Sequence, residues 1–161
     1  MPYEITIDGM AEISETLTRL EEKAPAVASK ALYKGAGIMA EELKKSAEDI
    51  QTAPFKYAKN GDTRLPSPEE KAVILSANGV GIARFKKDGT EIDTSVGYGN
   101  SGYAEMAGKT VPIPKIANAI NSGTSFMRKQ PFVRKASKTG GTKAMQAMKE
   151  SIEQDFEALT K

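Results

Sequence analysis

The sequence contains neither cysteine nor histidine, and these two absences remove whole classes of chemistry. Without cysteine there is no disulfide, no thiol nucleophile and no thiolate ligand for a metal. Without histidine there is no imidazole base or ligand, which excludes Ser-His-Asp and Cys-His catalysis and most zinc sites. Carboxylates remain, but they fall mainly beside lysines on helix-like segments, as in Glu41-Glu42 before Lys44-Lys45. We therefore expect no enzymatic activity and no cofactor.

Long apolar runs are also missing. The longest uninterrupted one, Ala72–Leu75, is far too short to span a bilayer, and no basic segment followed by an apolar one opens the chain. We expect no membrane partner and a protein made and kept in the cytoplasm. The 161 residues, 39% hydrophobic and 27% charged, are typical of one globular domain over residues 1–161.

Acidic residues are absent from one long stretch. Between Met106 and Lys149 there is no Asp or Glu. The basic residues of the stretch are Lys109, Lys115, Arg128, Lys129, Arg134, Lys135, Lys138, Lys143 and Lys149. Either the acidic N-terminal helices neutralise this segment, within the fold or across a subunit contact, or it attracts phosphates or an acidic partner surface.

Helical periodicity dominates both ends of the chain, after a short predicted strand at Tyr3–Asp8. A first helical stripe consists of Met10, Ile13, Leu17 and Leu20. Pro25 should end or kink this run and open a second helix. The second stripe consists of Ala28, Leu32, Gly35, Met39, Leu43, Ala47 and Ile50. Gly35 and Gly37 would let another backbone approach, either from the chain's own sheet or from another subunit. After a break at Gly140-Gly141, the terminal stripe consists of Met145, Met148, Ile152, Phe156 and Leu159.

The middle of the chain mixes loops and short elements. Residues 51–66 show neither helical nor strand periodicity. A loop of that length inside a domain is usually functional or mobile, and we expect this one to be mobile. Its rings, Phe55 and Tyr57, fit ordinary packing better than stacking on bases. Ser67-Pro68-Glu69-Glu70 predicts a capping box that opens a helix to about Ser76. A β-hairpin is predicted from residues 80–86 and 91–98.

The glycines that follow this hairpin, at positions 97, 99 and 102, fit a strand end and turn better than a phosphate-binding loop. Val111–Pro114 should be extended, with Pro114 opening a helix.

A glycine turn and an aromatic anchor follow. Gly123 can adopt a positive φ, with Thr124 beside it bonding local amides, so the chain should reverse here. Pro131 then fixes φ and should deliver Phe132 and Val133 to the core as the first turn of a helix, leaving Arg134 and Lys135 outward. The predicted fold is α+β: long N-terminal helices and a C-terminal helix packed on a small, mainly antiparallel β-sheet.

The order of these residues resembles a known signature. Gly123-Thr124, a basic link and Pro131-Phe132-Val133-Arg134 with Ala136 are similar to the C-terminal pattern of the lambdoid tail-component family, the tail-completion or neck proteins of long-tailed phages. Tyr98-Gly99 adds to the resemblance. The chain departs from the pattern in that Tyr103-Ala104-Glu105 lies well upstream of the Gly-Thr pair and residues 111–119 look inserted.

The resemblance implies a structural virion protein of a double-stranded DNA phage. It would form a homo-oligomeric ring, a hexamer in that family, assembled in the host cytoplasm and located in the neck around the DNA channel. Its partners would be the head connector or stopper protein and the tail terminator or tail-tube protein, with non-specific contact to DNA. Residues expected to face a partner or the channel are Lys109, Lys115, Arg128, Lys129, Arg134 and Lys135. The structural turn and anchor are Gly123, Thr124, Pro131 and Phe132. The alternative is a nucleic-acid-binding protein that acts through residues 109–149.

Overall fold

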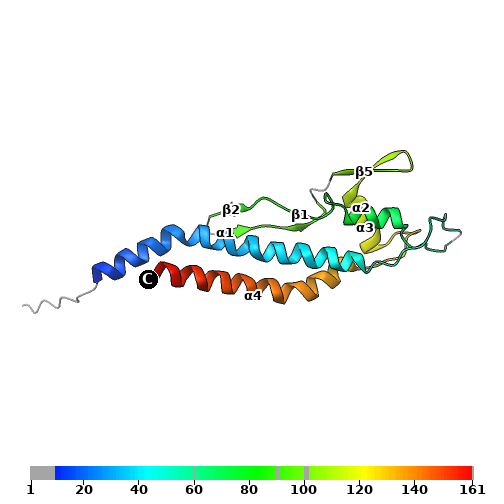
Figure 1. Cartoon of the computed structure of the whole chain (residues 1–161). Helices are drawn as coiled ribbons and strands as arrows, with labels where there is room; N and C mark the ends of the chain where they lie inside the picture. The colour runs from blue at the N-terminus through cyan, green and yellow to red at the C-terminus, as the bar shows by residue number, and fades with distance from the viewer. Residues whose placement is uncertain (1–9, 60, 90, 100–101, 161) are drawn as a thin grey trace, which may run out of the picture.

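The computed structural model describes residues 10–59, 61–89, 91–99 and 102–160, and Figure 1 shows their arrangement. In chain order the elements are α1 Met10–Glu48, α2 Pro68–Leu75, β1 Gly81–Ile82, β2 Lys86–Asp88, β3 Glu91–Asp93, β4 Val96–Gly97, β5 Tyr103–Met106, β6 Lys109–Pro112, α3 Ile113–Ser122 and α4 Phe132–Thr160. The α+β prediction is confirmed, with long N- and C-terminal helices and small antiparallel sheets. The strand predicted at 3–8 lies outside the described residues.

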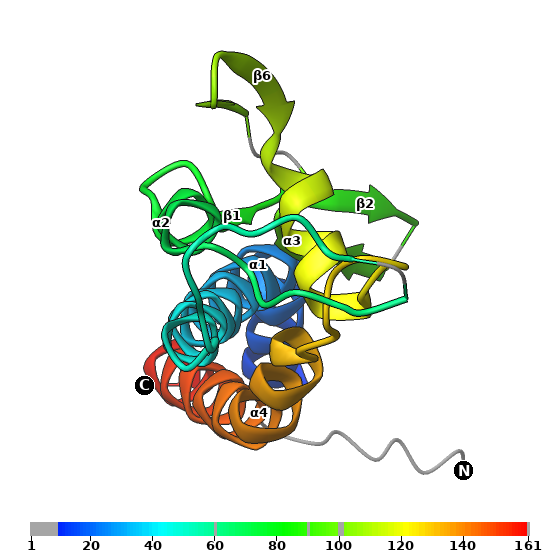
Figure 2. The same cartoon turned by 90° about the vertical axis from the view of Figure 1, so that its right-hand side faces the viewer.

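Two long helices form the frame of the molecule. α1 has 39 residues, or about 58 Å, and α4 runs antiparallel along it. Lys30 on α1 bonds Asp155 on α4 near one end of the pair, and Ser46 bonds the carbonyl of Phe132 at the other. α1 lies between α4 on one side and the strands on the other (Figures 1 and 2).

The predicted division of the N-terminal helix at Pro25 is wrong, because Pro25 lies inside the continuous helix α1. Its side chain is exposed, while Val27 just after it is buried. Residues on both sides of the proline, Lys23 and Val27, face Leu159 of α4 across a common groove. Packing on α4 therefore outweighs the hydrogen bond that proline removes. The part of α1 before this point lies at an angle to the rest in Figure 1.

The break predicted at Gly140-Gly141 is also wrong, since both glycines lie inside α4. A Cβ on Gly140 would lie 3.0 Å from Cβ of Glu42 and 3.0 Å from Sδ of Met39, both on α1. The same holds for a glycine of α1 that faces α4. A Cβ on Gly35 would lie 2.7 Å from Cγ of Met148. Gly35 and Gly140 thus permit close approach of the two helices. The neighbour that Gly35 admits is α4 of the same chain, and not the sheet or another subunit as expected, while a Cβ on Gly37 would meet nothing within 4 Å.

The predicted helix α2 and the predicted hairpin are both present. Ser67 and Glu70 form the expected capping box at the start of α2. In the hairpin, β1 pairs with β4 and β2 with β3, both antiparallel. Between the paired residues Ile82–Val96 and Lys86–Asp93, the first strand has three residues and the second has two. This extra residue corresponds to a β-bulge, which interrupts the alternation of faces between Ile82 and Phe85 on the first strand.

A second hairpin, β5–β6, was not predicted. Met106 pairs with Lys109, so the turn is the two residues Ala107 and Gly108, with φ of 51° and 73°. Positive φ at both central residues is the geometry of a type I′ turn, which usually carries Asn or Asp followed by Gly. Because alanine stands at the first central position of this turn, the sequence did not predict it.

The largest buried side chains gather where α2 and α3 meet the C-terminal part of α1 and the start of α4. The cluster consists of Leu43, Ala47, Ile50, Ile74, Tyr98, Ile113, Ile116, Ala117, Ile120, Met127, Phe132 and Ala136. We call this region the core end. The rest of the α1–α4 pair extends away from it, with β1 to β4 lying beside α1 for part of its length (Figure 1), and we call this region the arm.

Candidate interaction surface

The predicted turn at Gly123 is confirmed. Gly123 ends α3 with φ 76°, and its N–H donates to the carbonyl of Ala119 at 2.9 Å. The side-chain oxygen of Thr124 accepts from the N–H of Met127 at 3.0 Å, and the N–H of Thr124 donates to the carbonyl of Met127 at 3.0 Å. A Cβ on Gly123 would lie 3.0 Å from Cβ of Lys129, so the turn presses the basic link against the end of α3.

The anchor is confirmed for Phe132 but not for Val133. Phe132 is 3% exposed, and its ring lies edge-on to Tyr98 with centroids 5.9 Å apart. The carbonyl of Phe132 accepts a 2.7 Å hydrogen bond from the hydroxyl of Ser46. Val133 is 39% exposed, because one residue along the helix turns it away from α1. Pro131 immediately precedes α4, and its carbonyl accepts from the N–H of Lys135 at 3.2 Å.

Arg128 is fixed by backbone bonds to the 51–66 segment. Its N–H donates to the carbonyl of Arg64 at 2.8 Å, and the N–H of Arg64 donates to the carbonyl of Phe126 at 2.8 Å. Farther along, the side-chain amide of Gln130 donates to the carbonyl of Gln51 and accepts from its N–H, both at 2.9 Å. The basic link is therefore bonded to residues on both sides of the 51–66 loop. Periodicity gave no indication of these contacts.

The position of Arg64 is set by a partly enclosed ion pair. Its guanidinium donates to the two carboxylate oxygens of Glu70 at 2.7 and 2.6 Å, and both side chains are 12% exposed. The same carboxylate accepts from the N–H of Ser67 at 2.7 Å. Burial raises the pKa of Glu70, but the Arg64 hydrogen bonds, the Ser67 bonds and the Arg64 charge outweigh it, so this pKa lies below its usual value. Arg64 also stacks over Phe55, 4.8 Å from the ring centroid.

Three of the predicted basic residues line one cleft at the core end. Arg128, Lys129 and Lys135 surround a cleft of about 390 Å³, together with Asp49 and the end of α1. We call this the basic cleft. Arg128 and Lys129 also line a neighbouring cleft of about 400 Å³ beside the Gly123 turn. A hydrogen bond from Lys135 and its charge lower the pKa of Asp49, so one of the three cations is already paired.

The other predicted basic residues lie elsewhere. Lys109 begins β6, in the hairpin that projects at the top of Figure 2, and Lys115 is in the first turn of α3. Arg134 is exposed in the first turn of α4, two residues from Phe132 and so on nearly the opposite face of that helix. The six residues thus do not form one continuous surface.

Comparisons with family models, with curated proteins and with solved structures give no match to this chain. Within the described residues, no group of three or more Asp and Glu side chains could hold a metal ion. None of the helices in that part of the chain is long and apolar enough to cross a membrane.

Proposed function

We propose that the protein is a structural virion subunit of a long-tailed phage. Identical copies form a ring in the neck that joins the head connector to the tail tube and surrounds the DNA channel. The subunits are assembled in the host cytoplasm. The family resemblance indicates which proteins would contact the ring: a connector or stopper protein on one face and a tail terminator or tail-tube protein on the other.

The observation that carries an assembly role is the amount of surface that one copy exposes. The chain has 11618 Å² of accessible surface, whereas a compact monomer of 17.3 kDa has about 7,800 Å². The fourteen residues outside the described ranges, even fully extended, would account for only about 2,200 Å² of the difference. Residues with large apolar side chains exposed on this surface include Leu17, Tyr33, Phe55, Tyr57, Tyr103, Phe126 and Met145. Such surface is typical of a chain that packs against other chains.

The basic cleft supports the part of the proposal that concerns partners. Arg128 and Lys129 are exposed on a link that is bonded to Arg64 through its backbone and to Gln51 through the side chain of Gln130. Cations on a fixed backbone favour binding to an acidic partner surface or to phosphates, because less conformational entropy is lost on binding. The segment Gly123–Phe132, which carries the family resemblance, thus presents its basic residues beside the end of the α1–α4 pair.

The test is the assembly state of the purified full chain. Mass photometry and negative-stain imaging at several salt concentrations should show closed rings, either alone or when phage tail-tube ends are added. A protein that stays strictly monomeric at every concentration, with tail-tube ends present, would contradict the proposal.

Nucleic-acid binding is the second candidate, and it is favoured by Arg128 and Lys129 lying between two adjoining clefts. It predicts duplex binding whose affinity falls steeply with log[salt]. The double variant R128E/K129E should lower the magnitude of that slope by about 2. The matched control is K86E/K87E, which makes the same charge change on the exposed strand β2. Equal losses in the two variants would show only non-specific attraction to net charge.

A further inference from the structure

The charges of α4 are divided between its two halves. Residues 132–149 contain five basic residues and no acidic one, whereas residues 150–160 contain four acidic residues and no basic one. Because the helix is continuous from Phe132 to Thr160, the two halves cannot meet within one copy. They are, however, complementary in charge to each other, so the basic half of one copy attracts the acidic half of another.

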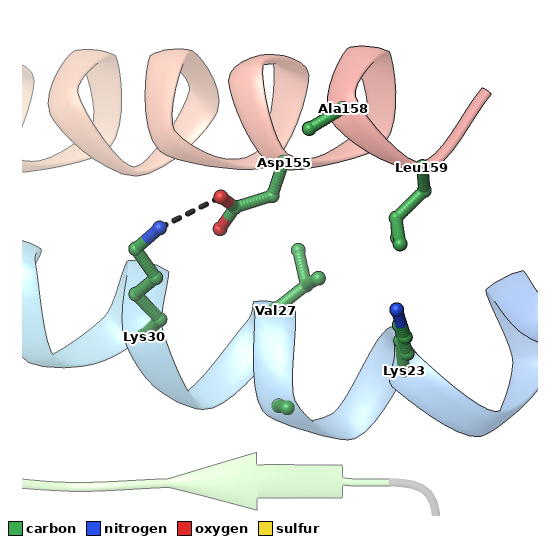
Figure 3. A pocket seen from close by; sticks show the side chains of 7 residues that line it. Lys23, Val27, Lys30, Asp155, Ala158 and Leu159 are labelled. Atoms are coloured by element: carbon green, nitrogen blue, oxygen red, sulfur yellow. Dashed lines mark hydrogen bonds and ion pairs between the residues drawn. The ribbon is translucent and has the colours of Figure 1, made fainter. Parts of the chain in front are cut away.

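Three of the four carboxylates of the second half point away from α1. Asp155 faces α1, where one of its oxygens lies 2.7 Å from the ammonium of Lys30 (Figure 3). The other three are exposed and lie three and four residues apart, so they form one row along the helix. One of them follows the buried Ser151 by two residues, or about 200° around the helix, which places the row opposite α1. We call this row the acidic stripe: Glu150, Glu153 and Glu157.

Little within the copy neutralises the acidic stripe. Glu153 is 3.9 Å from the ammonium of Lys149, and both side chains are more than half exposed. Glu157 has no ion pair among the described residues. Phe156, which precedes it, is 37% exposed. The stripe thus presents carboxylates together with an apolar ring.

The basic cleft has the opposite charge. Its lining contains three cations and one carboxylate, Asp49, so it attracts carboxylates and repels other cations. Arg128 and Lys129 are exposed, and neither has an ion pair among the described residues. Pro131 also lines the cleft and is exposed, so it offers apolar surface beside the cations.

We infer that the basic cleft of one copy binds the acidic stripe of a second copy. Arg128 and Lys129 pair with the carboxylates of the stripe, and the ring of Phe156 packs on Pro131. Along α4 the stripe begins 18 residues after Phe132, or about 27 Å, so a copy cannot fill its own cleft.

The contact joins two different surfaces, so it is head to tail. Each copy keeps one cleft and one stripe for its two neighbours, which allows a ring to close. The inference rests on the proposed ring and specifies one of its contacts.

The test is sedimentation velocity of the full chain at low and at high salt. At low salt R128E/K129E should weaken self-association about tenfold or more, and so should E153K/E157K, because each change brings like charges together. A chain that carries all four changes should recover association, since an acidic cleft then meets a basic stripe. High salt should reduce the differences between the variants.

Two control variants make the same changes of charge elsewhere on the surface. K86E/K87E reverses two exposed lysines of β2, and E21K/E22K reverses two exposed glutamates of α1. Neither should change association by more than about twofold. Thermal melts followed by circular dichroism verify that each variant is folded.

Each failure has a different meaning. A wild-type chain that never associates would contradict the ring itself, and so would a dimer as the largest species, because a two-fold pair fills both clefts at once. If the wild type forms larger species and E153K/E157K associates as the wild type does, the basic cleft has another occupant. That result would overturn the contact and leave the ring proposal standing, and so would a fourfold variant that does not recover.

Discussion

The core end and the arm are stabilised in different ways. At the core end, Ile74 and Ile120 are completely buried, and Phe132 is nearly so. Along the arm, the buried side chains are no larger than valine: Val27, Ala31, Ala36, Ala144 and Ser151. Burial of apolar area contributes about 25 cal/mol per Å², so the arm gains much less per residue than the core end does. We expect the arm to open before the core end unfolds, unless another chain covers it.

The largest expected effect comes from removing the anchor of the core end. Phe132→Ala deletes a buried ring that contacts Tyr98, and it should lower the free energy of unfolding by about 3 to 5 kcal/mol. Phe156→Ala is the matched change in the arm, where the ring is 37% exposed, and it should cost less than about 2 kcal/mol. Urea unfolding followed by circular dichroism measures both. Equal losses would show that the two regions do not differ as described.

Glu70 tests whether the core end depends on its enclosed ion pair. Glu70→Gln removes the charge that faces Arg64 and should cost about 2 to 3 kcal/mol at neutral pH. Because the pKa of Glu70 is lowered by folding, its stabilisation is present above the ordinary pKa of 4.5 and is lost as the pH falls through the folded pKa. The thermal midpoints of wild type and variant should therefore converge below about pH 4.5.

Glu69→Gln is the control for this charge change, since Glu69 is an exposed neighbour in the same helical turn and should have little effect. A difference between wild type and Glu70→Gln that stays constant down to pH 2 would contradict the role given to the Arg64–Glu70 pair.

Two adjacent glycines test the close approach of α1 and α4. Gly141→Ala adds a methyl group that meets nothing within 4 Å, so it should stabilise the helix by about 1 kcal/mol. Gly140→Ala gains the same helical propensity, but its methyl group would lie 3.0 Å from Met39 and Glu42. We expect Gly140→Ala to be less stable than Gly141→Ala by about 1 to 2 kcal/mol in urea unfolding. Equal stabilities would mean that the helices separate freely at this point.

The sequence predicted the elements whose causes are local. The Ser67–Glu70 capping box, the Gly123 turn and the buried Phe132 follow from residue types at fixed spacing, and all three are present. The same reasoning failed at Pro25 and Gly140, where contact between α1 and α4 outweighs local preference. Propensity describes one helix at a time, so it does not include such contacts.

The candidate surface was only partly predictable for the same reason. Exposure of Arg128 and Lys129 follows from a polar link between two elements, and both are exposed. The link that carries them is fixed by bonds from Arg128 to Arg64 and from Gln130 to Gln51. These bonds join residues more than sixty positions apart in sequence, and such long-range pairing has no periodic signal. The grouping of Lys135, but not Lys109, with them is likewise a property of the tertiary fold.

The smallest expected effect on stability is at the exposed pair of Lys135 and Asp49, whose side chains are 57% and 64% exposed. Lys135→Ala should leave the thermal midpoint within the scatter of repeated melts, because solvent screens an exposed ion pair. The hydrogen bond and charge of Lys135 lower the pKa of Asp49, so the variant should return that pKa toward 3.8, measurable by carboxyl NMR titration. A large loss of stability would contradict the small contribution that we assign to this exposed ion pair. If the melt is unchanged, any change that Lys135→Ala causes in assembly or in DNA binding reports directly on what the basic cleft contacts.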